Sequence, residues 1–124
     1  MDEPLAAMKN RPFRERLGFA LSGIILVFQR ERSFRTQGIL TAALIAAMFV
    51  LRPPPIWVGL AALATGFVLA LELINASIEY VLDHLHPAVA AEVKAAKDAA
   101  AGAVLIAGFA ALCVGAGMLL SCLP

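Results

Sequence analysis

The stretch ELINASIEYVLD, residues 72–83, places four polar side chains within or at the end of a long apolar run: Glu72, Asn75, Glu79 and Asp83. On a helix with about 100° of turn per residue, the last three lie about −60°, −20° and +20° from Glu72, so all four share one face over roughly 16 Å. A charged carboxylate at membrane depth is disfavoured by roughly 2.5–3.5 kcal/mol on insertion scales. Two carboxylates with an amide between them therefore indicate a site.

The composition indicates that this run lies in a membrane. Of the 124 residues, 61% are hydrophobic and only 15% are charged, and the mean hydropathy is +0.85. These values lie outside the range of ordinary soluble domains. We therefore predict an all-α membrane protein in which residues 1–124 form one integral membrane domain, and no nucleic-acid partner is part of this prediction.

The residues before the first long apolar run predict a surface helix at about 12–30. Apolar side chains recur there at spacings of three and four, which is typical of an amphipathic helix. Six basic residues lie between Lys9 and Arg32, and basic side chains favour the interface with anionic head groups. Residues 1–11 have no apolar segment behind a charged one, so we expect no signal peptide.

Three apolar runs predict three transmembrane helices. The three prolines at 53–55 cannot continue a helix, so the first two spans are expected to be antiparallel neighbours joined by a tight turn. The predicted spans are about 34–52, 56–83 and 98–122.

The basic residues near the spans predict the topology. Seven precede the first span and two lie between the second and third, against Arg52 alone on the opposite side. The amino terminus is therefore expected in the cytoplasm. Each span also carries small residues at every fourth position, which allow close helix packing. Because three spans enclose little volume, shielding Glu72 and Glu79 from lipid predicts a homo-oligomer.

By this topology, the cytoplasmic ends of all three spans gather at one level, bringing together Glu31, Glu79, Asp83 and the pair Lys97–Asp98. Carboxylates suit Mg²⁺, which takes one or two of them together with substrate phosphates, and a lysine suits a phosphate oxygen. This inventory fits phosphoryl transfer. Glu72, about 10 Å deeper than Glu79, would face the zone where a lipid hydroxyl lies.

Other interpretations remain open at this point. Glu72 and Asn75 could be interhelical hydrogen-bonding groups, or a protonatable site in a small proton-coupled transporter or ring-forming protein. Asp98 could instead favour the dipole of the third span, and Lys97 could extend to the interface. The chain has no Gly-rich phosphate loop of the Walker or protein-kinase type.

Three motifs together resemble the prokaryotic diacylglycerol kinase and undecaprenol kinase family. They are ERSFR at 31–35, ELINASIEYVLD at 72–83 and KDAAAGAVL at 97–105. The resemblance implies a homotrimer of three-span chains with a surface helix, in the bacterial inner membrane. It also implies transfer of the γ-phosphoryl group of ATP, with Mg²⁺, to a membrane lipid alcohol.

The resemblance also implies a role for each matching residue. Glu72 would be the general base for the lipid hydroxyl, with Asn75 positioning the substrate or the base. The remaining implied roles are metal binding by Glu31 and Glu79, phosphate contact by Lys97, and support of the nucleotide site and its lysine by Asp83 and Asp98.

The sequence departs from the family pattern at Arg30, where many members have Asn, and at Phe19, which replaces an aromatic hydroxyl. The segment 84–92 also lacks the usual run of an acid, an aromatic residue and a histidine. The motif KDAAAGAVL is closer to that of undecaprenol kinases than to the KDMGSAAVL motif of diacylglycerol kinases. The resemblance therefore favours undecaprenol over diacylglycerol as the substrate.

Overall fold

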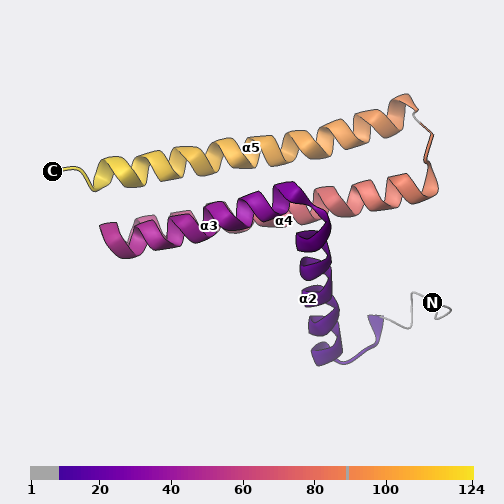
Figure 1. The fold of residues 1–124 in the computed structure, drawn as a ribbon, viewed down its shortest axis with the longest axis horizontal. Helices are drawn as coiled ribbons and strands as arrows, with labels where there is room; N and C mark the ends of the chain where they lie inside the picture. The colour runs from indigo at the N-terminus through magenta and orange to yellow at the C-terminus, as the bar shows by residue number, and fades with distance from the viewer. Residues whose placement is uncertain (1–8, 89) are drawn as a thin grey trace.

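The computed structural model describes residues 9–88 and 90–124. Within these residues, four long helices follow one another along the chain (Figure 1). They are α2 (Phe13–Arg30), α3 (Arg32–Leu51), α4 (Pro55–Leu85) and α5 (Ala91–Ser121). The side of the membrane on which the chain begins, and the expected absence of a signal peptide, concern residues that lie largely outside the described ones.

Helix α4 is the centre of the bundle. It packs against both α3 and α5, and within the described residues α3 and α5 make no contact with each other. The packing of α4 on α5 is close at Gly117, where an added Cβ would lie 2.6 Å from ring carbon Cη2 of Trp57. Such approaches depend on small residues.

Three of the helices, α3, α4 and α5, are long and apolar enough to cross a membrane. This finding confirms the predicted three-span architecture. Helix α3, with 20 residues, is about 30 Å long, which matches the hydrocarbon core. Helices α4 and α5, with 31 residues each, are about 46 Å long, so each extends beyond that core.

Helix α5 begins at Ala91, seven residues before the predicted start of the third span at 98. The additional residues include several alanines, which favour helix regardless of the surrounding solvent. The helix therefore continues past the apolar segment, and its first two turns carry the charged side chains that the apolar pattern excluded from the span.

The turn between α3 and α4 is as tight as its prolines predict. Arg52 closes α3 in the left-handed conformation, with φ 48°, and its N–H donates to the carbonyl of Met48. Helix α4 then begins at Pro55, a first-turn position at which proline sacrifices no intrahelical hydrogen bond.

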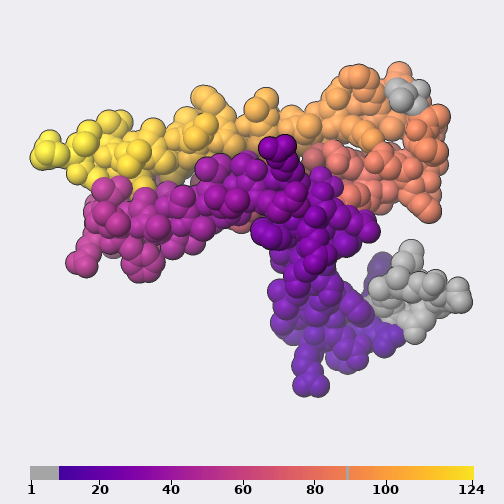
Figure 2. Space-filling model, viewed as in Figure 1, coloured from indigo at the N-terminus to yellow at the C-terminus, as the bar shows by residue number. Residues whose placement is uncertain are grey.

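Helix α2 leaves the bundle crosswise to the three spans, and Figure 2 shows it standing away from them. The chain turns at Glu31, whose backbone is extended (φ −106°, ψ 113°). The apolar side chains of α2 at positions 13, 17, 21, 24 and 28 are all exposed. Exposure of an apolar face on a helix that lies across the spans suits a position in the membrane interface.

The junction of α2, α3 and α4 contains a small apolar core. Val27, Phe34 and Ala76 are buried there, and Leu73 and Tyr80 pack against them. This core fixes the level on α4 at which α2 departs: it is at Ala76, between the turn that carries Glu72 and the turn that carries Tyr80.

Candidate functional site

Glu72 is the only buried charged residue among those described, with 6% of its surface exposed. Its Oε2 atom accepts a hydrogen bond from the Ser33 hydroxyl of α3 at 3.1 Å. The contact lies one turn from the apolar core at Ala76, on the side toward the middle of α4. Burial of a carboxylate is costly unless it is hydrogen-bonded, and Ser33 supplies such a bond.

The carboxylate of Glu31 is held on the other side of that core. The Tyr80 hydroxyl donates to its Oε1 atom at 2.9 Å, and the Arg30 guanidinium lies over the Tyr80 ring, 5.6 Å from its centroid. Glu79, the neighbour of Tyr80, is close enough to that hydroxyl for its charge to act on it. The charges of Glu31 and Glu79 therefore both act on the hydroxyl of one tyrosine.

Asn75 has a side-chain oxygen with an unusual environment. Its Oδ1 atom is buried and has no hydrogen-bond partner within the described residues. An unsatisfied buried acceptor costs free energy, so this oxygen is available to a donor that the single chain does not supply.

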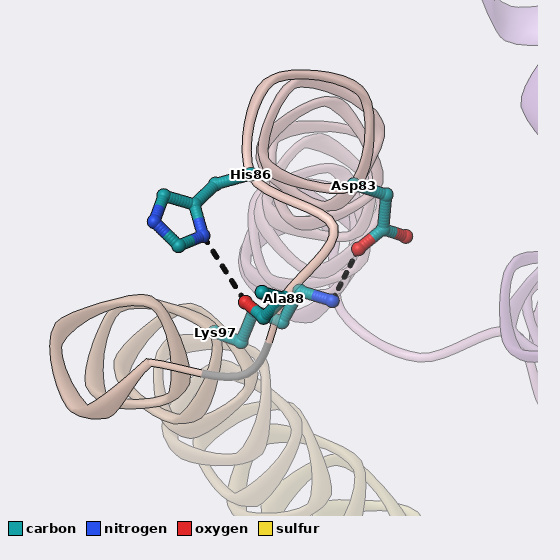
Figure 3. A network of polar contacts seen from close by, with 4 residues as sticks. All are labelled: Asp83, His86, Ala88 and Lys97. Atoms are coloured by element: carbon teal, nitrogen blue, oxygen red, sulfur yellow. Dashed lines mark hydrogen bonds and ion pairs between the residues drawn. The ribbon is translucent and has the colours of Figure 1, made fainter.

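The lysines of α5 are paired with two different carboxylates. Lys97 forms an ion pair with Asp83 of α4, whereas Asp98 pairs with Lys94 at 2.5 Å within α5. Figure 3 shows the Lys97 side chain reaching Asp83 beside the loop, in which His86 Nδ1 lies 3.1 Å from the carbonyl oxygen of Ala88. Residues of this loop and of α5 line a cavity of about 230 Å³ beside the Lys97–Asp83 pair.

The predicted residues thus form two groups within one chain. One group lies where α3 meets α4 and contains Glu72 and Glu31, and the other is the Lys97–Asp83 pair between α4 and α5. The charge of Glu79 acts on a member of each side, Tyr80 and Lys97. Glu72 and Asp83 are separated by roughly 16 Å along α4. Asp98 lies beside Lys94 and not at Lys97.

Sequence reasoning missed Ser33 as a partner of Glu72 and Tyr80 as a partner of Glu31. Both partners are far from their carboxylates in the chain, by 39 and 49 residues. For Ser33 the signal was its position two residues after Glu31, inside the ERSFR motif.

The family described as prokaryotic diacylglycerol kinase matches residues 18–119. The chain belongs to this family. The match spans every residue of both groups, from Glu31 to Asp98, and it confirms the resemblance that the three motifs indicated.

The chain is similar to a protein from Synechocystis sp. that is named "Diacylglycerol kinase". The two are 39% identical over 103 residues, which cover 82% of this chain and 59% of that protein. The chain therefore spans little more than half the length of its relative. No solved structure matches the chain.

Proposed function

We propose that this chain is a lipid kinase that transfers the γ-phosphoryl group of ATP to the hydroxyl of a membrane lipid alcohol. The observation that carries the proposal is the buried Glu72, hydrogen-bonded to Ser33 just inside the level at which α2 leaves the bundle. If α2 lies in the membrane interface, this is the depth of a lipid hydroxyl. Membership in the prokaryotic diacylglycerol kinase family supports the same activity.

In this proposal Glu72 is the general base. A base must come within about 2.6–3.2 Å of the proton that it accepts. Oε2 of Glu72 is engaged by Ser33, so Oε1 takes the proton of the lipid hydroxyl. The new bond joins the lipid oxygen to the γ-phosphorus, and the bond from that phosphorus to the bridging oxygen of ADP breaks.

Glu31 and Glu79 are the proposed ligands of Mg²⁺. Within residues 9–88 and 90–124, no three His, Cys, Asp or Glu side chains are grouped as metal ligands. Two carboxylates fit Mg²⁺, which usually keeps several waters and takes one or two carboxylates together with substrate phosphates. When bound, the ion neutralises charge on the phosphates. Only Oε1 of Glu31 takes the Tyr80 hydrogen bond, so Oε2 can face the ion.

Lys97 is the proposed phosphate contact, because an ammonium group suits a phosphate oxygen as a point charge. Asp83 holds Lys97 in place. Glu79 lies close enough to Lys97 to interact electrostatically with it, which supports a shared role at the nucleotide. In this proposal Asn75, with its unsatisfied Oδ1, accepts a hydrogen bond from substrate, and Asp98 acts through Lys94 at the edge of the site.

We favour undecaprenol over diacylglycerol because of the KDAAAGAVL motif, although the Synechocystis relative is named for diacylglycerol. The proposed active species is a homotrimer in the bacterial inner membrane, with the amino terminus in the cytoplasm.

The test is transfer of label from [γ-³²P]ATP to undecaprenol and to diacylglycerol, measured side by side with Mg²⁺ in mixed micelles. Both lipids are tested at the same mole fraction. We expect a labelled lipid phosphate with at least one of them. Label in neither lipid would contradict the proposal.

A proton-coupled transporter that uses Glu72 makes a different forecast, because it needs no nucleotide. A ligand that binds the folded state raises thermal stability by mass action. Stabilisation of the solubilised protein by MgATP supports the kinase, whereas no effect at millimolar MgATP favours the transporter.

A further inference from the structure

The serine and threonine hydroxyl groups of the chain fall into two classes. Of the seven Ser and Thr residues, six donate to a carbonyl of their own helix three or four residues earlier. Such bonds are the usual outcome for Ser and Thr in a helix. Ser33 alone reaches a side chain of another helix, the carboxylate of Glu72.

The break between α2 and α3 explains why Ser33 differs. A serine in a continuous helix would donate to the carbonyl three or four residues earlier, which here belongs to Arg30 or Gln29, both on the far side of the break. The chain is extended at Glu31, and the carbonyl of Gln29 already accepts a hydrogen bond from Nη1 of Arg35 at 2.9 Å. The Ser33 hydroxyl is thus released from its own backbone.

Ser33 does not serve as a helix cap either. It is the second residue of α3, and Glu31 at the N-cap position makes no side-chain capping hydrogen bond. The hydroxyl therefore has one described role, which is to donate to Glu72 across the contact of α3 with α4.

We propose that Ser33 is a positioning residue that aims the carboxylate of Glu72 at the lipid hydroxyl. This inference rests on the proposed function. A glutamate side chain has three rotatable torsions, so burial alone does not orient its carboxylate. A directional bond to Oε2 fixes the plane of the carboxylate and leaves Oε1 for the acceptor.

The position of Ser33 also connects the orientation of the Glu72 carboxylate to the proposed metal site. Ser33 is two residues from Glu31, on the same first turn that the break creates. A shift of α3 relative to α4 would move the base and the Glu31 carboxylate together. Ser33 thereby keeps the base in register with the proposed metal and nucleotide.

The test compares Ser33→Ala, Ser33→Thr and Thr36→Val in the full chain, with steady-state kinetics on the lipid alcohol and separate measurement of MgATP affinity. Misplacement of a reacting group by about 1 Å can reduce the rate about 100-fold. We expect Ser33→Ala to lower kcat about 10- to 100-fold while the KM for MgATP changes less than about twofold. Ser33→Thr, which keeps the hydroxyl, should retain most of the activity.

Thr36→Val is the matched control, because the Thr36 hydroxyl bonds only to the Arg32 carbonyl of the same helix. It should leave kcat unchanged. In a Glu72→Gln background, Ser33→Ala should cause no further loss, because the group that it aims has been disabled. An unchanged kcat in Ser33→Ala, equal damage in Ser33→Thr, or a parallel rise in KM for MgATP would overturn the inference.

The failure of this inference is distinguishable from the failure of the proposed function. If the wild-type chain phosphorylates a lipid alcohol but Ser33→Ala has the same kcat, only the role of Ser33 is wrong. If the wild-type chain labels no lipid alcohol, the proposed function fails and the role of Ser33 fails with it.

Discussion

Two hydroxyl–carboxylate bonds connect α4 to the junction of α2 and α3, and they run in opposite directions. Ser33 of α3 donates to Glu72 of α4, and Tyr80 of α4 donates to Glu31 at the junction. The apolar core at Ala76 lies between them. One carboxylate is thereby held in the buried interior and the other toward the end of α4, roughly two turns away.

Glu72 and Glu79 lie about two turns apart on α4, and we predict that their substitutions have different effects. Glu79→Gln should weaken MgATP binding, because a metal ligand also holds the ground-state complex. Tyr80→Phe should do the same to a smaller extent, because it removes only the bond that orients Glu31. Both effects are measurable as a shift of the Mg²⁺ concentration needed for half-maximal MgATP binding. If both variants need the same Mg²⁺ concentration as wild type, Glu31 and Glu79 are not the metal ligands.

The candidate residues of α4 could be predicted from sequence, because a carboxylate in an apolar run is conspicuous whatever surrounds it. Their partners could not. Ser33 is an ordinary serine in a polar segment, and its contact with Glu72 depends on how α3 is placed against α4. The pairing of Asp98 with Lys94 follows from their spacing of four residues within α5, which competes with the pairing to Lys97 that the motif suggested.

The break between α2 and α3 is the element on which the site depends. Nη1 of Arg35, in the first turn of α3, donates to the carbonyl oxygens of Phe28 and Gln29 at 2.9 Å each. These carbonyls belong to the last turn of α2, where carbonyl groups have no N–H partner within their own helix. Arg35 therefore fastens the end of one helix to the start of the next.

We predict that Arg35→Ala lowers stability by roughly 1–3 kcal/mol, because it removes two hydrogen bonds from a charged donor. Protease cleavage near residue 31 should become faster. Thermal unfolding in detergent and limited proteolysis measure the two effects. Arg32→Ala removes an exposed arginine of the same helix turn and serves as the control. Equal stability of the two variants would show that Arg35 does not hold the junction.

The helices themselves were largely predictable because apolar runs, prolines and charges mark their ends. The predicted surface helix at about 12–30 and first span from about 34 already placed a break near Glu31, whereas the early start of α5 was not predicted. In α5, residues 91–97 are mostly the helix formers Ala, Glu and Lys, and neither length nor hydropathy distinguishes a solvated extension of a span from a loop.

At the scale of the whole molecule, one chain does not bring all the proposed groups together. Lys97 is engaged by Asp83, roughly 16 Å along α4 from Glu72, and large apolar side chains remain exposed on all three spans. A neighbouring copy of the chain could cover these faces and bring its own Lys97 or Glu72 to the site.

This arrangement predicts complementation between inactive chains. If the proposed assembly shares its sites between chains, a mixture of Glu72→Gln and Lys97→Ala protomers should regain part of the activity, because some sites would combine an intact base with an intact lysine. Each variant assembled alone provides the baseline. Mixtures no more active than their parents would argue that each site is built within one chain.

The central claim, that Glu72 is the base of a lipid kinase, is tested most directly by single-turnover transfer of label from [γ-³²P]ATP to the lipid alcohol in Glu72→Gln, with MgATP affinity measured on the same preparation. Glutamine keeps the shape and hydrogen-bonding capacity of the side chain but cannot accept the proton. We predict a rate about 10²- to 10⁴-fold below wild type, with MgATP affinity nearly unchanged. A near-normal rate, or a loss of MgATP affinity as large as that of Glu79→Gln, would contradict the account.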